Sequence, residues 1–325
     1  MDFAFSEEQE LLRAAARDYL SDRYPTDRVV ELVEGDPGWD PQSWKELTDM
    51  GWLDDELGFL EHAVLAEETG RALYPGPLFT TLAMARPAGY DGEGPGTLAH
   101  HADPTVTTSG DSLSGSKKFV PDITSATGVV VVTDNGLYVV QTEAQGVTVT
   151  PRSTMDHSRR YGELALENAS GNRVADESVL PSVRRRALAW LACEAVGVAQ
   201  RALDTATEHA KERKAFDRPI GTFQAVSHQI ADVFTQVELA RSLAYWAAWA
   251  VDVDDERADL AVAAAKSAAA EAAVFACERA IQVLGGIGFT WEHFLHRYYK
   301  RAQWIDSFEG YAAQHRAAIA DAVLA

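Results

Sequence analysis

The stretch RKAFDRPIGTFQ, residues 213–224, joins two long alanine-rich segments in which apolar residues recur at helical spacing. Pro219 predicts a turn, so that Arg213 ends one helix and Gln224 begins the next. An arginine side chain and the N–H groups at the start of a helix can together hold a phosphate or pyrophosphate, and Phe216 can pack on a ring. A structural interpretation competes, because basic residues also stabilise the C-terminal end of a helix. On spacing alone, the structural interpretation is favoured.

A second, glycine-rich stretch is QVLGGIGF, residues 282–289. Three glycines within four positions let the backbone approach a ligand closely. The same glycines fit the C-terminal end of a long helix predicted for residues 257–284, since glycine commonly follows the last helical residue. Taken by itself, the end of a helix is the simpler interpretation.

The rest of the chain predicts the order α, β, α. We expect a helical domain at 1–85, a small antiparallel β domain at 105–175 and a helical bundle at 182–325. The β domain depends on alternating apolar residues and on the tripeptide DNG at 134–136, a hairpin signal because Asn and Gly accept positive φ. Residues 90–104, rich in Gly, predict a loop. The predicted fold class is therefore α+β and mainly helical.

The composition excludes several classes of protein. A net charge of −20 argues against a general nucleic-acid binder or a binder of anionic membranes, since both need positive fields. The acidic N-terminal segment does not predict an export signal, and no stretch approaches about 18 uncharged apolar residues, so no membrane span is expected. Cys193 and Cys277 lie in apolar helical patterns and predict buried thiols, which suits a reducing cytoplasm.

The two quoted stretches together resemble the C-terminal domain of the acyl-CoA dehydrogenase family. Their combined pattern is RxxFxxPIxxFQ followed by QxxGGxGFTWEHxxxRYYxRA. Four further segments match the remaining landmarks of that family in the same order: FSEEQELLRAAARDYL, LAEETGRAL, LSGSKKFV and DHSRRYGEL. The resemblance covers nearly the whole chain.

This resemblance implies a helical N-terminal domain, a β domain and a C-terminal four-helix bundle. It also implies FAD as the cofactor and desaturation of an acyl-CoA thioester between its α and β carbons, with a carboxylate as the base and the flavin as hydride acceptor. Electrons then pass to an electron-transferring flavoprotein. In this family the two motifs hold the pyrophosphate and adenosine end of a neighbouring subunit's FAD. The matching residues here are Arg213, Phe216, Gln224, Gln282, Gly285 and Gly286.

The sequence departs from the family where the flavin ring would bind. The family's segment like TEPxAGSD has no counterpart before LSGSKKFV. The positions that match the aromatic residue and the Thr beside the flavin are Phe119 and Pro121, and proline has neither an N–H nor a hydroxyl to donate. A smaller departure is Asp217, where the family often has Gly. We therefore expect the half of the site for the flavin ring to be absent and the half for the diphosphate to be retained.

A partner subunit with a complete β domain reconciles these features. The chain is similar to the shortened subunit of heteromeric acyl-CoA dehydrogenases of bacterial steroid side-chain degradation. In those enzymes the shortened subunit pairs with a full-length subunit in an α2β2 heterotetramer. That resemblance implies an FAD shared with the partner and a bulky steroid thioester as substrate. The alternatives are an independent homomeric dehydrogenase, a catalytically silent structural subunit, and the same fold with other flavin chemistry, such as a monooxygenase or a nitroalkane-type oxidase.

Two carboxylates are candidates for the base. The resemblance places Glu309, in DSFEGY, at the Glu that is the general base in many family members, although a carboxylate there also suits the start of the closing helix. Glu194 lies on an apolar helix face, where a structural hydrogen bond is expected. A base earlier on that helix is excluded, because the matching residue is Ala187.

Two pairs of residues suggest other sites only weakly. His293 and His296 have no third ligand at the spacing of a zinc site. We therefore expect them to take part in packing and hydrogen bonding, and we expect no metal. Arg159 and Arg160 can meet a CoA phosphate, but two basic residues in a loop are expected simply to be solvated.

Overall fold

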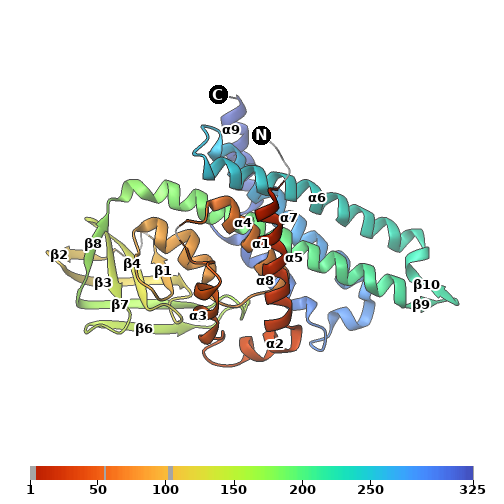
Figure 1. Cartoon of the computed structure of the whole chain (residues 1–325), viewed down its shortest axis with the longest axis horizontal. Coiled ribbons are helices and arrows are strands. Elements are labelled where there is room, and N and C mark those ends of the chain that lie inside the picture. The colour runs from red at the N-terminus through yellow and green to blue at the C-terminus, as the bar shows by residue number, and fades with distance from the viewer. Residues whose placement is uncertain (1–4, 55, 102–104, 325) are drawn as a thin grey trace. The chain divides into compact units, whose positions relative to one another are not determined.

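The computed structural model describes residues 5–54, 56–101 and 105–324. The chain consists of two compact units (Figure 1). The helical unit contains residues 1–30, 58–74 and 188–325, and the sheet unit contains residues 31–57 and 75–187. Two of the four boundaries fall inside helices, at residues 30/31 in α2 (Thr26–Glu34) and 187/188 in α5 (Leu180–Glu212).

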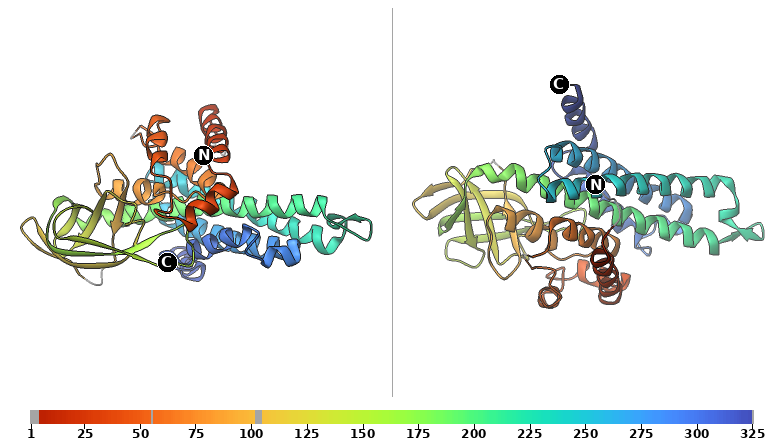
Figure 2. Two further views of the ribbon diagram at one scale, coloured as in Figure 1. Left: turned by 90° about the horizontal axis from the view of Figure 1, so that it is seen from below. Right: turned by 45° about the horizontal axis from the view of Figure 1, so that its top comes forward.

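The helical unit is built around one alanine-rich helix. α7 packs against α6, α8 and α9, and most of its alanines are buried in these contacts. Figure 2 shows α5 and α6 running side by side to the short hairpin that joins them. Besides α5, the helices of this unit are α1 (Glu7–Arg23), α4 (Phe59–Ala72), α6 (Gln224–Asp252), α7 (Ala258–Leu284), α8 (Leu295–Ser307) and α9 (Ala312–Leu324).

Two glycines bring the backbones of α4 and α5 into contact. A Cβ atom on Gly70 would collide with the carbonyl oxygen of Glu194, and a Cβ atom on Gly197 would collide with the carbonyl oxygen of Glu67. This close approach requires glycine at both positions. It leaves Glu194 fully buried in the bundle.

Two four-stranded sheets enclose the core of the sheet unit. One has the strand order β1-β4-β5-β8 and the other the order β2-β3-β7-β6. Apolar side chains from both sheets, among them Val131 and Leu164, form one buried cluster. The strands are β1 (Gly96–Ala99), β2 (Thr107–Ser109), β3 (Ser112–Pro121), β4 (Gly128–Thr133), β5 (Gly136–Gln141), β6 (Val147–Arg152), β7 (Tyr161–Ser170) and β8 (Asn172–Ala175). The short helices are α3 (Gln42–Asp49), the π-helix η1 (Thr80–Ala85), and the 3₁₀-helices η2 (Arg86–Ala88) and η3 (Glu177–Val179).

The predicted fold class is confirmed: the chain is mainly helical, with a small β region followed by a bundle of helices. The hairpin predicted at 134–136 is confirmed as the turn between β4 and β5. Two details of the prediction are wrong. The loop predicted for residues 90–104 contains β1, and β1 pairs with β4 in parallel, so the β region is not purely antiparallel. The division into three domains at the expected boundaries stays a prediction.

The chain has no window of about 18 uncharged apolar residues, as expected, but one helical run passes a weaker test for a membrane span. By length and composition alone, the run Ala258–Phe289, which contains α7, qualifies. However, 67% of its most apolar window is buried inside the protein, as in the core helix of a globular bundle. The expectation of buried thiols is confirmed, because Cys193 in α5 and Cys277 in α7 are both free and buried.

Candidate functional site

The junction between α5 and α6 is a short exposed hairpin. β9 (Lys214–Ala215) pairs antiparallel with β10 (Arg218–Pro219), and the 3₁₀-helix η4 (Ile220–Thr222) then leads into α6. The main chain of Arg213 is anchored on both sides, since its N–H donates to the carbonyl of His209 (2.9 Å) and its carbonyl accepts from the N–H of Ile220 (2.8 Å). The residue itself is exposed to solvent. The hairpin therefore presents a fixed backbone with an exposed guanidinium.

The tip of this hairpin holds an aromatic side chain in an unfavourable conformation. Phe216 and Asp217 have φ angles of 53° and 63°, the left-handed conformation of a type I′ turn. Asp tolerates this region, which explains why Asp217 can stand where the related family often has Gly. A bulky residue such as Phe does not, and Phe216 is 89% exposed. A strained, exposed aromatic residue indicates a contact outside this chain.

The glycine-rich stretch is equally open. It forms the 3₁₀-helix η5 (Gly285–Phe289) directly after α7. Gly285 has φ 67° and ψ −136°, a conformation that residues with a Cβ atom rarely adopt. A Cβ atom on Gly285 or Gly286 would meet nothing within 4 Å, and Gln282 is exposed. The backbone here is accessible to a ligand from outside the chain.

Helix geometry places both stretches at one end of the bundle. α6 and α7 pack together and are joined only by residues 253–257, so they run antiparallel. The start of α6 at Gln224 and the end of α7 at Leu284 therefore lie at the same end. Electrostatics agrees: burial lowers the pKa of His293, after η5, and the charge of His209, near the end of α5, lowers it further. We call Arg213, Phe216, Gln224, Gln282, Gly285 and Gly286 the hairpin surface.

The hairpin surface has the donors that an anion needs. The residue before α6, Phe223, provides no side-chain cap, which leaves the first N–H groups of the helix available to a ligand. Arg218 stacks over the ring of Phe223 at 4.1 Å. Burial and the nearby Arg213 guanidinium lower the pKa of His209. Basic and acidic residues alternate here, with Arg213, Lys214 and Arg218 beside Glu212 and Asp217.

Glu309 lies in a turn that the protein holds firmly. It is half-buried between α8 and α9, with a φ angle of 55°. The ammonium of Lys266, a fully buried residue of α7, donates to the carbonyl oxygens of Asp306 (3.2 Å) and Gly310 (3.4 Å). The Nε2 atom of His315 lies 3.1 Å from the same Gly310 oxygen.

The hairpin surface and Glu309 are far apart within the helical unit. Nineteen residues separate Lys266, which contacts the Glu309 turn, from Gly285 at the end of α7. At about 1.5 Å per residue, this is about 28 Å along the helix. The two groups of predicted site residues are therefore not brought together in one chain.

Glu194 has the structural role that was predicted for it. Its Oε1 atom accepts from Nη1 of Arg301 at 2.5 Å, and both side chains are fully buried. A carboxylate neutralised in this way inside the bundle is not available as a base. Ala187 is buried as well.

In the sheet unit, the two residues expected beside a flavin ring lie on β3. Phe119 is 64% exposed, with a φ angle of 54° at a bulge. Pro121 is buried and pairs with Tyr161 of β7, and its carbonyl accepts from the hydroxyl of Thr97. Neither side chain offers a hydrogen bond donor for a flavin ring, and Pro121 also lacks a main-chain N–H.

The expectation that Arg159 and Arg160 are solvated is wrong. Arg159 is 3% exposed and its guanidinium lies 5.2 Å from the centre of the Phe79 ring. Arg160 donates to the carbonyl of Gly35 at 2.7 Å. Both arginines therefore pack within the sheet unit, and neither guanidinium extends into solvent to bind a phosphate of CoA.

The two histidines of WEHFLHRYY take part in packing. His293 accepts from the N–H of Leu295 at 3.2 Å and stacks on Phe294. His296 lies against Trp291, with ring centres 4.7 Å apart. Among the residues that the structure describes, no group of three or more His, Cys, Asp or Glu is arranged to hold a metal ion.

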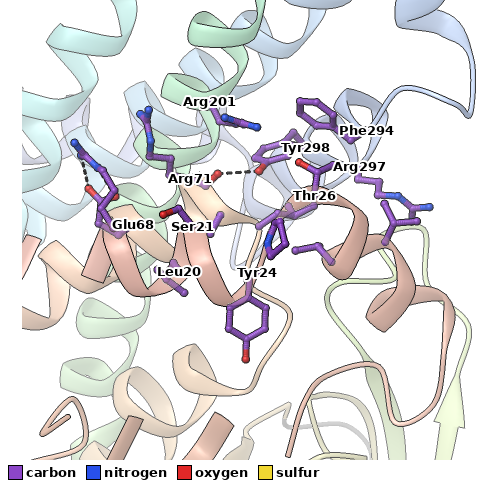
Figure 3. Close-up of a pocket in the computed structure, with 16 residues that line it drawn as sticks. Leu20, Ser21, Tyr24, Thr26, Glu68, Arg71, Arg201, Phe294, Arg297 and Tyr298 are labelled. Atoms are coloured by element: carbon purple, nitrogen blue, oxygen red, sulfur yellow. Dashed lines mark hydrogen bonds and ion pairs between the residues drawn. The ribbon is translucent and has the colours of Figure 1, made fainter. Parts of the chain in front are cut away.

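Sequence reasoning missed a cavity of about 300 Å³ in the helical unit (Figure 3). Its walls come from five helices, α1, α2, α4, α5 and α8, and four arginines are among its lining residues. No local motif marks these residues, because they are spread from Arg17 to Tyr298 along the chain. An excess of arginine on the inner ends of several helices was the only available signal.

Known proteins resemble this chain over most of its length. Residues 185–324 match the family model of the acyl-CoA dehydrogenase C-terminal domain. The chain is 31% identical over 319 residues to acyl-CoA dehydrogenase IpdE2 of Mycobacterium tuberculosis, and the match covers 91% of each protein. It resembles the structure of the ChsE4-ChsE5 complex from the same organism, with 26% identity, a TM-score of 0.89 and coverage of 100% of this chain and 99% of that one. It also resembles a variant of the Tcur3481-Tcur3483 steroid ACAD, with 28% identity, a TM-score of 0.87 and 98% coverage of both chains.

Proposed function

The chain belongs to the acyl-CoA dehydrogenase family, and we propose that it is the shortened subunit of a heteromeric, FAD-dependent member of that family. It completes the FAD site of a full-length partner subunit in the cytoplasm, as part of a heterotetramer. The assembly introduces an α,β double bond into a bulky steroid side-chain thioester of CoA. An electron-transferring flavoprotein accepts the electrons. The relatives described as a two-component complex and as a steroid ACAD support the partner and the substrate class.

The observation that carries this proposal is the conformation of Phe216. A protein that only needed a turn between α5 and α6 would place Asn or Gly at this position, since both accept positive φ. Phe216 instead keeps a strained backbone and exposes its ring, beside an anchored arginine and an uncapped helix. This arrangement suits the diphosphate and adenosine end of an FAD that is held by another subunit.

The residues of this chain fit one end of FAD and not the other. The open backbone at Gly285 and Gly286 accepts a ligand at close range, which suits the pyrophosphate and adenosine. The side chains of Phe119 and Pro121 supply no donor for the flavin ring, and Pro121 has no main-chain N–H. We therefore assign the ring to the partner subunit and derive no step at a flavin ring within this chain.

The contribution of this chain to the reaction is to bind and position the cofactor. Flavin supplies the hydride acceptor, and a carboxylate must take the α-proton of the thioester. Arg213 and the first N–H groups of α6 hold the negative charge of the diphosphate, while Phe216 packs against the adenosine end. Because about 28 Å of α7 separates Lys266, at the Glu309 turn, from Gly285, this chain does not bring Glu309 to the hairpin surface, and we assign the base at the shared centre to the partner subunit.

A second candidate function is an independent homomeric dehydrogenase that uses Glu309 as its base. The contacts of Lys266 and His315 favour it, since they fix the turn that carries this carboxylate. The absence of ring donors on β3 weighs against it. The first function is preferred because it accounts for both the hairpin surface and β3.

The test is the retention of FAD by the complex formed on co-expression with a full-length acyl-CoA dehydrogenase subunit. Arg213→Ala should weaken FAD binding by about 1.5–3 kcal/mol, or roughly ten- to a hundredfold, because it removes a charge-assisted contact. Lys214→Ala is the matched control, because it removes the same charge one residue away, at the start of β9. FAD binding that is equal in wild type and Arg213→Ala would instead support a silent structural subunit.

A further inference from the structure

The cavity in the helical unit is distinct from the hairpin surface. It lies beneath the C-terminal end of α1 and the start of α2, and is closed by α4, α5 and α8. Its wall on α5 is Arg201, twelve residues before Arg213, which is about 18 Å along the helix. Its volume of about 300 Å³ is at the lower end of the range for small-molecule sites, about 300–1,000 Å³. A whole acyl-CoA or FAD does not fit this space.

Positive charge is concentrated around the cavity. Four arginines line it, Arg17, Arg71, Arg201 and Arg297, against a single acidic residue, Glu68. Arg17 binds Glu68 through two hydrogen bonds, of 3.0 and 2.6 Å. Arg71 pairs with Asp204 at 2.6 Å. Basic residues therefore outnumber acidic ones in the cavity lining, in a chain whose net charge is −20.

Arg201 is held in a fixed position with hydrogen bonding capacity to spare. Its guanidinium lies 5.2 Å from the centre of the Phe294 ring. Its Nε atom is buried and has no hydrogen bond partner within the described part of the chain. In Figure 3, Arg201 lies next to Arg71 and above Tyr298. A pre-positioned guanidinium is a ready contact for an oxyanion.

Tyr298 adds a neutral polar group to the same wall. Its hydroxyl donates to the carbonyl oxygen of Arg71 at 2.8 Å. Burial raises the pKa of Tyr298 to about 12, although the nearby arginines act in the opposite direction. The phenol therefore stays protonated at neutral pH and does not cancel the positive charge of the arginines.

Part of the cavity lining is apolar. Leu20, Val29 and Leu73 line it and are each at most 3% exposed. Such a surface is favourable for hydrocarbon and offers nothing to a fully hydrated inorganic ion. The combination of an arginine wall and an apolar floor selects for a molecule with one anionic end.

We propose that this cavity binds a small organic anion, a carboxylate or phosphate group on a compact apolar body. The anionic group contacts Arg201 and Arg71, and the apolar body packs against Leu20, Val29 and Leu73. This site neither uses the hairpin surface nor depends on the proposed function, and its occupant is too small to be the thioester substrate.

The experiment is isothermal titration calorimetry on the purified full-length protein in its native assembly. The probes are inorganic phosphate, hexanoate and phenyl phosphate. Hexanoate or phenyl phosphate should bind at least tenfold more tightly than inorganic phosphate. Whichever of these two binds more tightly identifies the headgroup as a carboxylate or a phosphate.

Two variants and two controls make the test specific. Arg201→Gln should weaken binding of the organic anions at least tenfold, through loss of charge. Ala72→Leu fills the cavity and changes no charge, and it should weaken binding to a similar extent even if Arg201→Gln fails to fold. Arg152→Gln, in the sheet unit, and Arg316→Gln, in the helical unit, each remove a charge from an ion pair at the surface and should both bind like wild type. The proposal is overturned if no probe binds at millimolar concentrations, or if Ala72→Leu binds like wild type.

Discussion

Lys266 and Gly310 are joined by a hydrogen bond of 3.4 Å between a fully buried ammonium and a main-chain carbonyl. The same ammonium also donates to the carbonyl of Asp306, so Lys266 spans both sides of the turn that contains Glu309. The C-terminal end of α8 is thereby capped from the side by α7. This pair fixes the direction in which the chain leaves α8 and enters α9.

Removing the ammonium should destabilise the protein more than it affects catalysis. Lys266→Met keeps the aliphatic length and leaves the main-chain carbonyl groups of Asp306 and Gly310 without this donor. The free energy of unfolding should fall by about 1–3 kcal/mol, measured by urea denaturation. With the base in the partner subunit, the kcat of the assembled enzyme should stay within a factor of about three, roughly 0.6 kcal/mol in the activation barrier. A large loss of kcat without a loss of stability would contradict this assignment.

Replacing the carboxylate itself tests which subunit carries the base. Glu309→Gln is nearly isosteric and removes only the capacity to accept a proton. In the complex with a full-length partner, we expect the rate of thioester dehydrogenation, measured by bleaching of the flavin, to stay within a factor of about ten of wild type. Loss of a general base would instead lower the rate by about 10²–10⁴. A reduction within that larger range would assign the base to this chain and favour the homomeric function.

A substitution that relieves the strain at Phe216 should affect the stability of the protein and its binding of FAD in different ways. Phe216→Asn places a residue that tolerates positive φ in the type I′ turn, so the free energy of unfolding should rise or stay constant, within about 1 kcal/mol. FAD binding by the complex should nevertheless weaken. Thermal unfolding without cofactor and FAD titration measure the two effects. A variant that loses stability but keeps FAD would show that the ring serves only this chain.

The buried pair of Glu194 and Arg301 should be a major determinant of folding. Arg301→Met leaves the Glu194 carboxylate without its partner at a site with no exposed surface, and should cost about 3–5 kcal/mol. Arg316→Met is the matched control, because Arg316 pairs with Glu271 where both side chains are half exposed. Urea denaturation should separate the two variants clearly. Equal midpoints would contradict a structural role for the buried pair.

Local signals in the sequence predicted the elements that depend on local chemistry. The DNG tripeptide predicted the turn between β4 and β5, and Pro219 with the neighbouring helical patterns predicted the junction of α5 and α6. In both cases the conformation follows from residues within a few positions of one another. The prediction for Glu194 also held, because a lone carboxylate on an apolar helix face must be paired when it is buried.

Features that depend on distant contacts were not predictable in this way. β1 is a four-residue strand in a glycine-rich stretch, and it forms only because β4 offers a parallel edge. Arg159 looks solvated in its loop, but Phe79 covers it. The cavity requires side chains from five helices at once, so no window of sequence contains it.

The most direct test of the shared-cofactor account is the ratio of FAD to protein in two preparations. The chain purified alone should be colourless, and the chain purified with a full-length partner should contain one FAD for each pair of subunits. One FAD per chain in a preparation that contains only this polypeptide would contradict the account.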